Sequence, residues 1–287
     1  MIPNRKAVVS IGLLVIAGTV QAATTFINTC PFVISSPGDY LLSADLACPS
    51  GGNGITITSS HVTLKFEGHT MRSVGSNTAI SNSSGEVNTP VTDVHILGPG
   101  LIHSFSTGLK FTVGVSLLGN VTDSEMSGIT VQGSTTGIQA LGTANTGLTL
   151  TKNTVVGGTE GILVGGFTSS TISENVVSGN TIGIQIANAG VTGGSPIMLR
   201  QNKVIGNLNT GVDIDGGFVT AQNNIISGNS TLGISVTARL GATIALEITN
   251  NTALANGLFD LNDGVPNCTG TVWSGNTFVT ANQSCIH

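Results

Sequence analysis

The segment Gly211-Val-Asp-Ile-Asp-Gly-Gly217 contains the two acidic residues whose spacing best suits chemistry. Asp213 and Asp215 are separated by one residue, so their side chains point to the same face of an extended strand. Two such carboxylates can coordinate a hard cation such as Ca²⁺, or one can act as an acid on a glycosidic bond while the other stays ionised. The alternative is that both are solvated carboxylates on a strand surface.

Polar residues of neighbouring sequence repeats align with these two carboxylates. The predicted binding face consists of Gln185, Asp213, Asp215, Ser235 and Thr237. Carboxylate, amide and hydroxyl groups together can bind a sugar or a Ca²⁺ ion. Asp213 and Asp215 are the candidate catalytic residues if the protein is an enzyme.

The elements that position these residues form an internal repeat. A Gly followed by alternating apolar and polar residues recurs every 22 to 28 residues, at Gly114, Gly137, Gly161, Gly183, Gly211 and Gly233. A period of two residues indicates strands, and strands this short must stack on their neighbours to bury a face. We therefore predict an all-β fold, a right-handed single-stranded parallel β-helix of about 9–10 turns. A leucine-rich repeat is the structural alternative, but its leucine pattern is absent.

A second marker, an Asn followed by apolar residues, recurs in phase with the glycines. Its members are Asn153, Asn175, Asn202, Asn224 and Asn251. We predict a structural ladder in which their amides hydrogen-bond between turns, and in which Asn supplies the left-handed backbone of a tight bend.

Two apolar columns should fill the interior of the solenoid. One contains Val155, Val177, Val204 and Ile226. The other contains Leu150, Ile172, Leu199 and Ile248, with Ala221 as a gap. The longer spacing before Gly211 predicts an inserted loop around residues 191–196.

The N-terminal segment and the overall composition restrict location and partners. Residues 1–22 have the charged, apolar and small-residue regions of a signal peptide, which predicts a secreted protein, extracellular or periplasmic, with no membrane span after cleavage. A membrane anchor is the alternative, but the apolar run is shorter than the roughly 20 residues that span a bilayer. Only 8% of residues are charged and the basic ones form no cluster, so nucleic-acid binding is not expected.

Four cysteines lie in two pairs near the ends of the chain. Cys30 and Cys48 fall in residues 23–53, which we expect to cap the solenoid, and Cys268 and Cys285 close the C-terminal end of a β-helix over residues 54–282. Three pairings are open in principle, but a rigid solenoid holds its ends apart and favours local disulfides. Zinc binding is the alternative, although no C-x-x-C motif is present.

The remaining titratable residues offer weaker candidates. His69 is expected to be a packed or capping residue. His95 and His103 are eight residues apart, with Asp93 near His95, but no third ligand has suitable spacing, so no metal site is predicted. An ion pair between Lys152 and Glu174 is expected on the surface.

Segments at both ends resemble secreted bacterial proteins with right-handed parallel β-helix repeats, of the pectate-lyase-like superfamily. The matching segments are Ser36-Pro-Gly-Asp-Tyr-Leu41, Val62-Thr-Leu-Lys-Phe-Glu-Gly-His-Thr-Met71 and Trp273-Ser-Gly-Asn-Thr-Phe278. The resemblance implies the fold and export. It implies no single activity, because the superfamily includes lyases, polygalacturonases, epimerases and non-enzymes.

Three functional hypotheses follow. The favoured one is a cell-surface or extracellular glycan-binding protein, because the polygalacturonase motifs Asn-Thr-Asp and Gly-His-Gly and the epimerase-like Asp-Pro-His are absent. A lyase or hydrolase acting on an acidic polysaccharide is the second, and a structural or adhesive rod is the third. A polysaccharide is the expected partner, and Ca²⁺ is the candidate cofactor.

Overall fold

The computed structural model describes residues 23–49, 51–73, 75, 77–82, 91–104, 111–187, 194–237 and 244–287. The predicted signal peptide and residues 191–193 of the predicted inserted loop lie outside these residues. The rest of that loop, residues 194–196, belongs to no strand.

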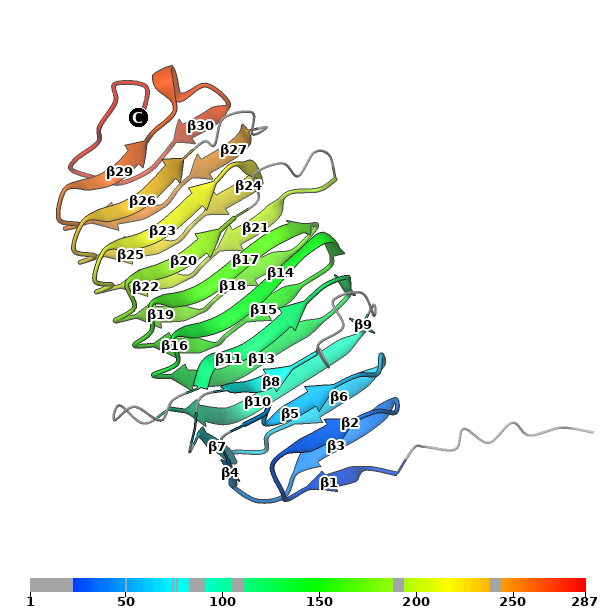
Figure 1. Ribbon diagram of the computed structural model, residues 1–287. Coiled ribbons are helices and arrows are strands. Elements are labelled where there is room, and N and C mark those ends of the chain that lie inside the picture. Colours follow the sequence, from blue (N-terminus) through cyan, green and yellow to red (C-terminus); the bar gives the residue numbers. More distant parts are fainter. Residues whose placement is uncertain are drawn as a thin grey trace, which may run out of the picture.

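The chain coils into a right-handed parallel β-helix of about nine turns, drawn as stacked strands in Figure 1. Each regular turn contributes one strand to a 12-stranded sheet, sheet B, and two strands to an 18-stranded sheet, sheet A. Every named strand pairing among the described residues is parallel. The predicted fold class is confirmed.

The strands of sheet B form one wall of the coil. They are β2 (Phe32–Ile34), β5 (Ile55–Ile57), β8 (Asn77–Ser81), β9 (Val91–Thr92), β11 (Phe111–Leu118), β12 (Val121–Thr122), β14 (Thr136–Thr146), β17 (Glu160–Thr168), β20 (Ile182–Ile186), β23 (Thr210–Asp215), β26 (Leu232–Thr237) and β29 (Phe259–Asp263).

The strands of sheet A form the other two walls. They are β1 (Thr25–Ile27), β3 (Gly38–Leu42), β4 (Leu46–Cys48), β6 (Val62–Lys65), β7 (Thr70–Ser73), β10 (Val94–His103), β13 (Glu125–Gln132), β15 (Thr149–Thr151), β16 (Thr154–Val156), β18 (Thr171–Ser173), β19 (Val176–Ser178), β21 (Ile197–Arg200), β22 (Lys203–Ile205), β24 (Gly217–Gln222), β25 (Ile225–Ser227), β27 (Ile244–Thr249), β28 (Thr252–Leu254) and β30 (Thr271–Ser274). One short 3-10 helix, η1 (Pro266–Cys268), precedes β30.

Apolar side chains stack in columns along the interior. The strand register aligns Leu150, Ile172, Leu199, Ala221 and Ile248 in one column, as predicted. It also aligns the predicted second column, Val155, Val177, Val204 and Ile226. All nine side chains are at most 1% exposed, so each strand buries one face against the turns above and below it.

The repeated glycines allow successive turns to approach closely. A Cβ atom added to Gly183 would lie 2.5 Å from the carbonyl oxygen of Gly211 and 2.6 Å from the side chain of Val204. Any larger residue at this point would push two turns apart. The glycine marker in the sequence is therefore a packing requirement.

The asparagines form a hydrogen-bonded ladder at the bend between the two walls of sheet A. Asn202 is 1% exposed, and its Nδ2 donates to Asn224 Oδ1 at 3.0 Å. Its Oδ1 accepts from the backbone N–H and the Nδ2 of Asn175, at 3.0 and 2.9 Å. The pattern runs from Asn153 through Asn251 to Asn276.

The left-handed residue of this bend is not the ladder asparagine, and this part of the prediction is wrong. The positive φ angles of 55° to 56° belong to the residue one position earlier, at Lys152, Glu174, Gln201, Asn223 and Asn250. Asn is required for its buried amide, which both donates and accepts. The preceding residue makes the bend and points into solvent, so its side chain is free to vary.

A second ladder, not predicted from the sequence, lies at the bend that leads back to sheet B. Its members are Asn180, Asn207, Asn229 and Asn256, each five residues after an asparagine of the first ladder. It ends at Asp260, whose Oδ1 accepts from the N–H and the Nδ2 of Asn256. The repeated spacing of five residues was the sequence signal for it.

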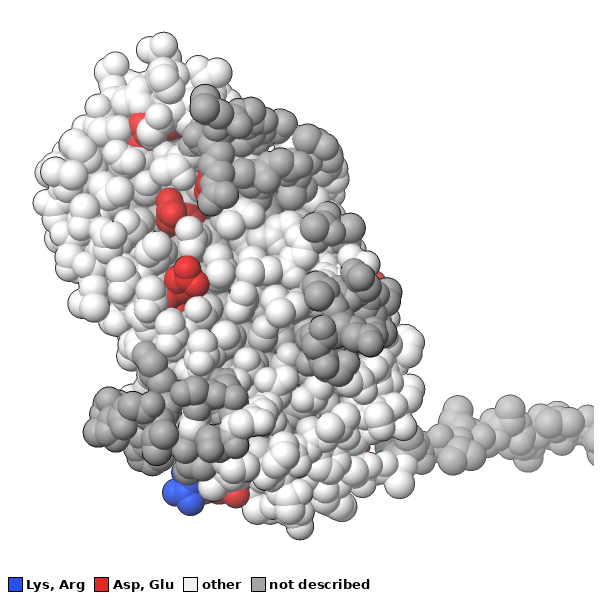
Figure 2. All heavy atoms as spheres, viewed as in Figure 1, with Lys and Arg blue, Asp and Glu red and all other residues white. Residues whose placement is uncertain are grey.

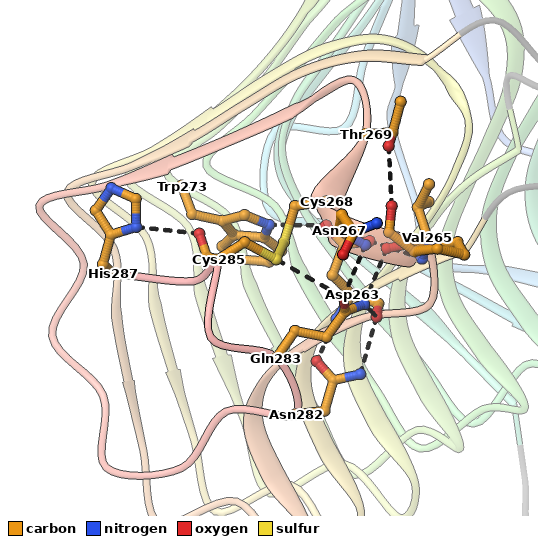
Figure 3. The surroundings of a disulfide bond; sticks show 11 residues. Asp263, Val265, Asn267, Cys268, Thr269, Trp273, Asn282, Gln283, Cys285 and His287 are labelled. Carbon is orange, nitrogen blue, oxygen red and sulfur yellow. Dashed lines mark hydrogen bonds between the residues drawn. A yellow bond between two sulfur atoms is a disulfide. The ribbon is translucent and has the colours of Figure 1, made fainter.

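Disulfides join Cys30 to Cys48 and Cys268 to Cys285, one near each end of the rod. Figure 3 shows the C-terminal cap, where Trp273 Nε1 donates to the buried Asp263 at 2.8 Å beside the second disulfide. Disulfides are compatible with an oxidising compartment. Among the described residues, no helix is long and apolar enough to cross a bilayer.

Candidate functional site

Three of the predicted binding residues, Gln185, Asp213 and Ser235, lie in one column of sheet B, and the other two, Asp215 and Thr237, are aligned with each other at the strand ends. The strand register aligns Gln139, Leu163, Gln185, Asp213, Ser235 and Asn262 on consecutive turns. We call this set the Asp213 column. Figure 2 shows isolated acidic spots on an otherwise uncharged surface over this part of the molecule.

Neighbouring residues of the Asp213 column are hydrogen-bonded to one another. Gln185 Nε2 donates to Asp213 Oδ2 at 3.3 Å, and Asn262 Nδ2 donates to Ser235 Oγ at 3.4 Å. Gln185, Asp213 and Asn262 are each partly exposed. The column thus presents the amide of Gln185 bonded to the carboxylate of Asp213 on two consecutive turns, and the amide of Asn262 bonded to the buried Ser235 beyond them.

Two residues of the predicted face are buried, contrary to expectation. Asp215 is 5% exposed and Ser235 is 3% exposed, whereas Thr237 is exposed. Asp215 is the last residue of β23, where the chain turns through Gly216 and Gly217, so it lies at the strand end and not on the open face. Ser235 is short and lies between the longer side chains of Asp213 and Asn262.

The burial of Asp215 weakens the prediction that the two aspartates act as a pair. Only Asp213 is accessible to a ligand from the outer face, so the pair does not offer two exposed carboxylates for acid–base catalysis. Ca²⁺ is usually held by six to eight oxygen ligands. The described part of the chain contains no group of three or more His, Cys, Asp and Glu side chains arranged to hold a metal.

A chain of four titratable residues crosses three turns on the outer face of sheet A. His61 Nδ1 lies 2.8 Å from Asp93 Oδ2, and His95 Nε2 lies 2.8 Å from Asp93 Oδ1. His95 Nδ1 lies 3.2 Å from Glu125 Oε2. We call His61, Asp93, His95 and Glu125 the His95 relay.

The hydrogen bonds of the His95 relay favour its charged forms. Partial burial alone would lower the pKa of His95, but the hydrogen bonds to Asp93 and Glu125 outweigh it and raise that pKa above its ordinary value. Hydrogen bonds from His61 and His95 lower the pKa of Asp93. Protonated His95 and ionised Asp93 are therefore favoured as an ion pair, and the hydrogen bonds of the relay join three turns.

Sequence reasoning found His95 and Asp93 but missed His61 and Glu125. The strand register brings Glu125 beside His95, in one outward column with Thr63 and Thr149, and the sequence repeat carried no signal for His61. His69, expected to be a packed or capping residue, lies 3.4 Å from Asp45. The predicted ion pair between Lys152 and Glu174 is present at 3.9 Å.

Comparison with known proteins identifies the fold and several structures that share it. A family model described as right handed beta helix region matches residues 113–286. The Dettilon tailspike protein (gp208) aligns with a TM-score of 0.51 and 14% identity, over 90% of this chain and 60% of that chain. The A-module of the Azotobacter vinelandii mannuronan C-5 epimerase AlgE4 aligns with a TM-score of 0.43 and 12% identity, over 84% and 65%.

A tailspike of E. coli bacteriophage HK620 in complex with a pentasaccharide aligns with a TM-score of 0.44 and 13% identity, over 87% of this chain and 61% of that chain. This chain therefore spans less than two thirds of the length of these three structures. Identities this low show the fold alone. No curated protein matches the chain.

Proposed function

Because this chain belongs to the right-handed β-helix family, we propose that it is a secreted glycan-binding protein whose ligand lies along the Asp213 column of sheet B. The observation that carries the proposal is the set of partly exposed groups in one column, the amide of Gln185 and the carboxylate of Asp213 on consecutive turns and the amide of Asn262 two turns farther along. The amides can both donate to and accept from the hydroxyl groups of a sugar, and the carboxylate can accept from them.

The mutual hydrogen bonds support this role. Gln185 and Asp213 are held together before any ligand arrives, which lowers the entropy lost when a ligand binds. A parallel stack also places the side chains of successive turns about 4.8 Å apart along the rod, which suits an extended chain better than a compact ligand. The tailspike and epimerase structures belong to proteins whose names connect this fold with polysaccharides, which is consistent with the proposal.

The test is a glycan array probed with the purified protein, followed by calorimetry on the best ligand. The double substitution Gln185→Ala with Asp213→Ala should weaken binding about tenfold or more, because hydrogen bonds to a charged group contribute about 1.5–3 kcal/mol. Gln222→Ala, a partly exposed glutamine on sheet A, is the matched control and should bind as the parent does. Equal affinity of the double variant and the parent would exclude this column.

The same experiment separates the alternative functions. A lyase acting on an acidic polysaccharide would release unsaturated products that absorb ultraviolet light, and a hydrolase would shorten the glycan. Running each assay with Ca²⁺ and with a chelator tests the candidate cofactor. A structural rod would bind no glycan on the array.

A further inference from the structure

We propose that the ligand of the Asp213 column is an uncharged glycan, whose sugars rest their apolar faces on a second column of sheet B. The strand register aligns this second column on consecutive turns, and its members are Ile182, Thr210, Leu232 and Phe259. We call it the Phe259 column. The inference rests on the proposed function, because it names the class of ligand for the same face.

The Phe259 column lies on the outer face of sheet B, beside the Asp213 column. Each of its members precedes a member of the Asp213 column by three residues, and the two residues between them are buried on all four turns. A Cβ added to Gly183 would meet the interior side chain of Val204, so Gly183 faces inward and Ile182 faces outward. No outward side chain therefore separates the two columns on these turns, and they lie about 10 Å apart along the strands.

The Phe259 column offers apolar surface that a ligand can reach. Ile182, Leu232 and Phe259 are partly exposed, and only Thr210 is buried, at 6% exposure. Aliphatic and aromatic side chains pack against the C–H groups on the face of a sugar ring. A sugar that lies across both columns would place these C–H groups on one column and its hydroxyl groups on the amides and the carboxylate of the other.

The charges of sheet B disfavour an anionic glycan. Among the described residues, every Lys and Arg lies in sheet A or at its bends, namely Lys65, Arg72, Lys152, Arg200 and Lys203. The strands of sheet B carry acidic residues instead, of which Glu160 and Asp213 are partly exposed. In Figure 2, the only blue atoms lie near the N-terminal end of the face drawn. A uronate polymer has one negative charge per sugar and would find no positive partner on the described strands of sheet B.

A cationic glycan is also a poorer fit than an uncharged one. A polymer of amino sugars has one positive charge per sugar, whereas Asp213 is the only partly exposed carboxylate in the two columns over the four turns from β20 to β29. Glu160 lies on the turn before these and already accepts from Thr136 Oγ1. The other cations would lose hydration against the Phe259 column without gaining a partner. Asp213 can instead accept from a sugar hydroxyl.

The experiment measures calorimetric binding of the purified protein to tetrasaccharides that differ in charge. Mannotetraose, cellotetraose and the N-acetylglucosamine tetramer are the uncharged probes, tetramannuronate is the anionic probe, and the glucosamine tetramer is the cationic probe. We expect at least one uncharged tetramer to bind, with an affinity that changes by less than about twofold between about 50 and 500 mM NaCl, because no charges pair. Both charged tetramers should bind at least about tenfold more weakly.

Variants of the Phe259 column make the result specific. Phe259→Ala should weaken binding of the uncharged tetramer by about three- to tenfold, because apolar contact is lost, whereas Phe259→Tyr keeps the ring and should bind within about twofold of the parent. Leu232→Thr introduces the residue type already present at Thr210 and should weaken binding by about threefold. Phe218→Ala, at a partly exposed phenylalanine of sheet A, is the matched control and should bind as the parent does. Melting temperatures check that each variant is folded.

The inference is overturned if either charged tetramer binds as tightly as the uncharged ones, or if Phe259→Ala and Leu232→Thr both bind like the parent. A charged glycan whose binding depends on Gln185 and Asp213 would support the proposed function while overturning this choice of ligand. Absence of binding to any glycan would overturn both, so the two failures are distinguishable.

Discussion

His95 contacts a carboxylate with each of its ring nitrogens, Asp93 on one side and Glu125 on the other. Only the protonated imidazole can donate from both nitrogens, so the surroundings of this residue favour its cationic form. Asp93 accepts from His61 as well. At the scale of single residues, these four titratable groups join three turns of the coil.

The raised pKa of His95 predicts a pH-dependent stability. Because the pKa is higher in the folded state, the stabilising effect is complete below the ordinary histidine pKa of about 6.5 and is lost as the pH rises through the folded-state pKa. The lowered pKa of Asp93 has the opposite pH dependence. Its stabilising effect is present at neutral pH and is lost only in acid, below about pH 4. The melting temperature should therefore fall as the pH rises above the ordinary histidine pKa of about 6.5.

His95→Gln should remove most of that fall, with melting followed by circular dichroism at half-unit pH steps. His287→Gln, at the exposed C-terminus, is the control and should keep the parent profile. A parent protein with a flat profile over this range would contradict the assignment of the His95 relay.

The two asparagine ladders lie at the bends that connect the strands of each turn. Each ladder amide donates to the next turn and accepts from the previous one, so the ladders have a direction along the rod. Asp260 ends the second ladder with a carboxylate, which needs only to accept. Burial alone would raise the pKa of Asp260, but N–H donors of Asn256, Val279 and Thr280 outweigh it and lower that pKa.

Removing one amide from the first ladder should destabilise the coil. Asn202→Ala removes the acceptor of the buried N–H and Nδ2 of Asn175 and the amide that donates to Ile172 and Asn224, so we expect a loss of about 1–3 kcal/mol in the free energy of unfolding. Thr237→Ala, at an exposed strand end, should change it by less than about 0.5 kcal/mol. Urea denaturation measures both, and equal midpoints for the two variants would refute the ladder's contribution.

The whole molecule is a rod in which each turn contacts mainly its neighbours, so its two ends require special protection. At the C-terminal end, the segment after β30 returns across the last turn (Figure 3). Asp263 accepts from the backbone N–H of Val265 and from Trp273, and the Cys268–Cys285 disulfide links this segment to η1. These contacts cover an apolar end that would otherwise face water.

Opening that disulfide should loosen the C-terminal end first. The double variant Cys268→Ser, Cys285→Ser removes a crosslink between residues 17 apart and should lower stability by about 3 kcal/mol. Hydrogen exchange should then show lost protection in β29 and β30, with β14 and β17 unchanged. Uniform loss along the whole rod would contradict independent protection of the end.

The repeat alone was enough to predict the β-helix, the two interior columns and the first asparagine ladder. These features depend on alternation and spacing within each turn, and every turn repeats the same information. The sequence also indicated the order of residues in the Asp213 column, because β20, β23 and β26 are regular.

Other features could not be predicted from the repeat, because they depend on how turns of unequal length align and on which side chains the neighbouring turns bury. His61 and Asp93 lie on turns separated by 32 residues, and their alignment is not visible in a period of about 22. The burial of Asp215 follows from the turn after β23, where the chain passes through Gly216 and Gly217 into the next strand. Accessibility and hydrogen-bond satisfaction are properties of the assembled coil, since the atoms that cover a side chain come from other turns.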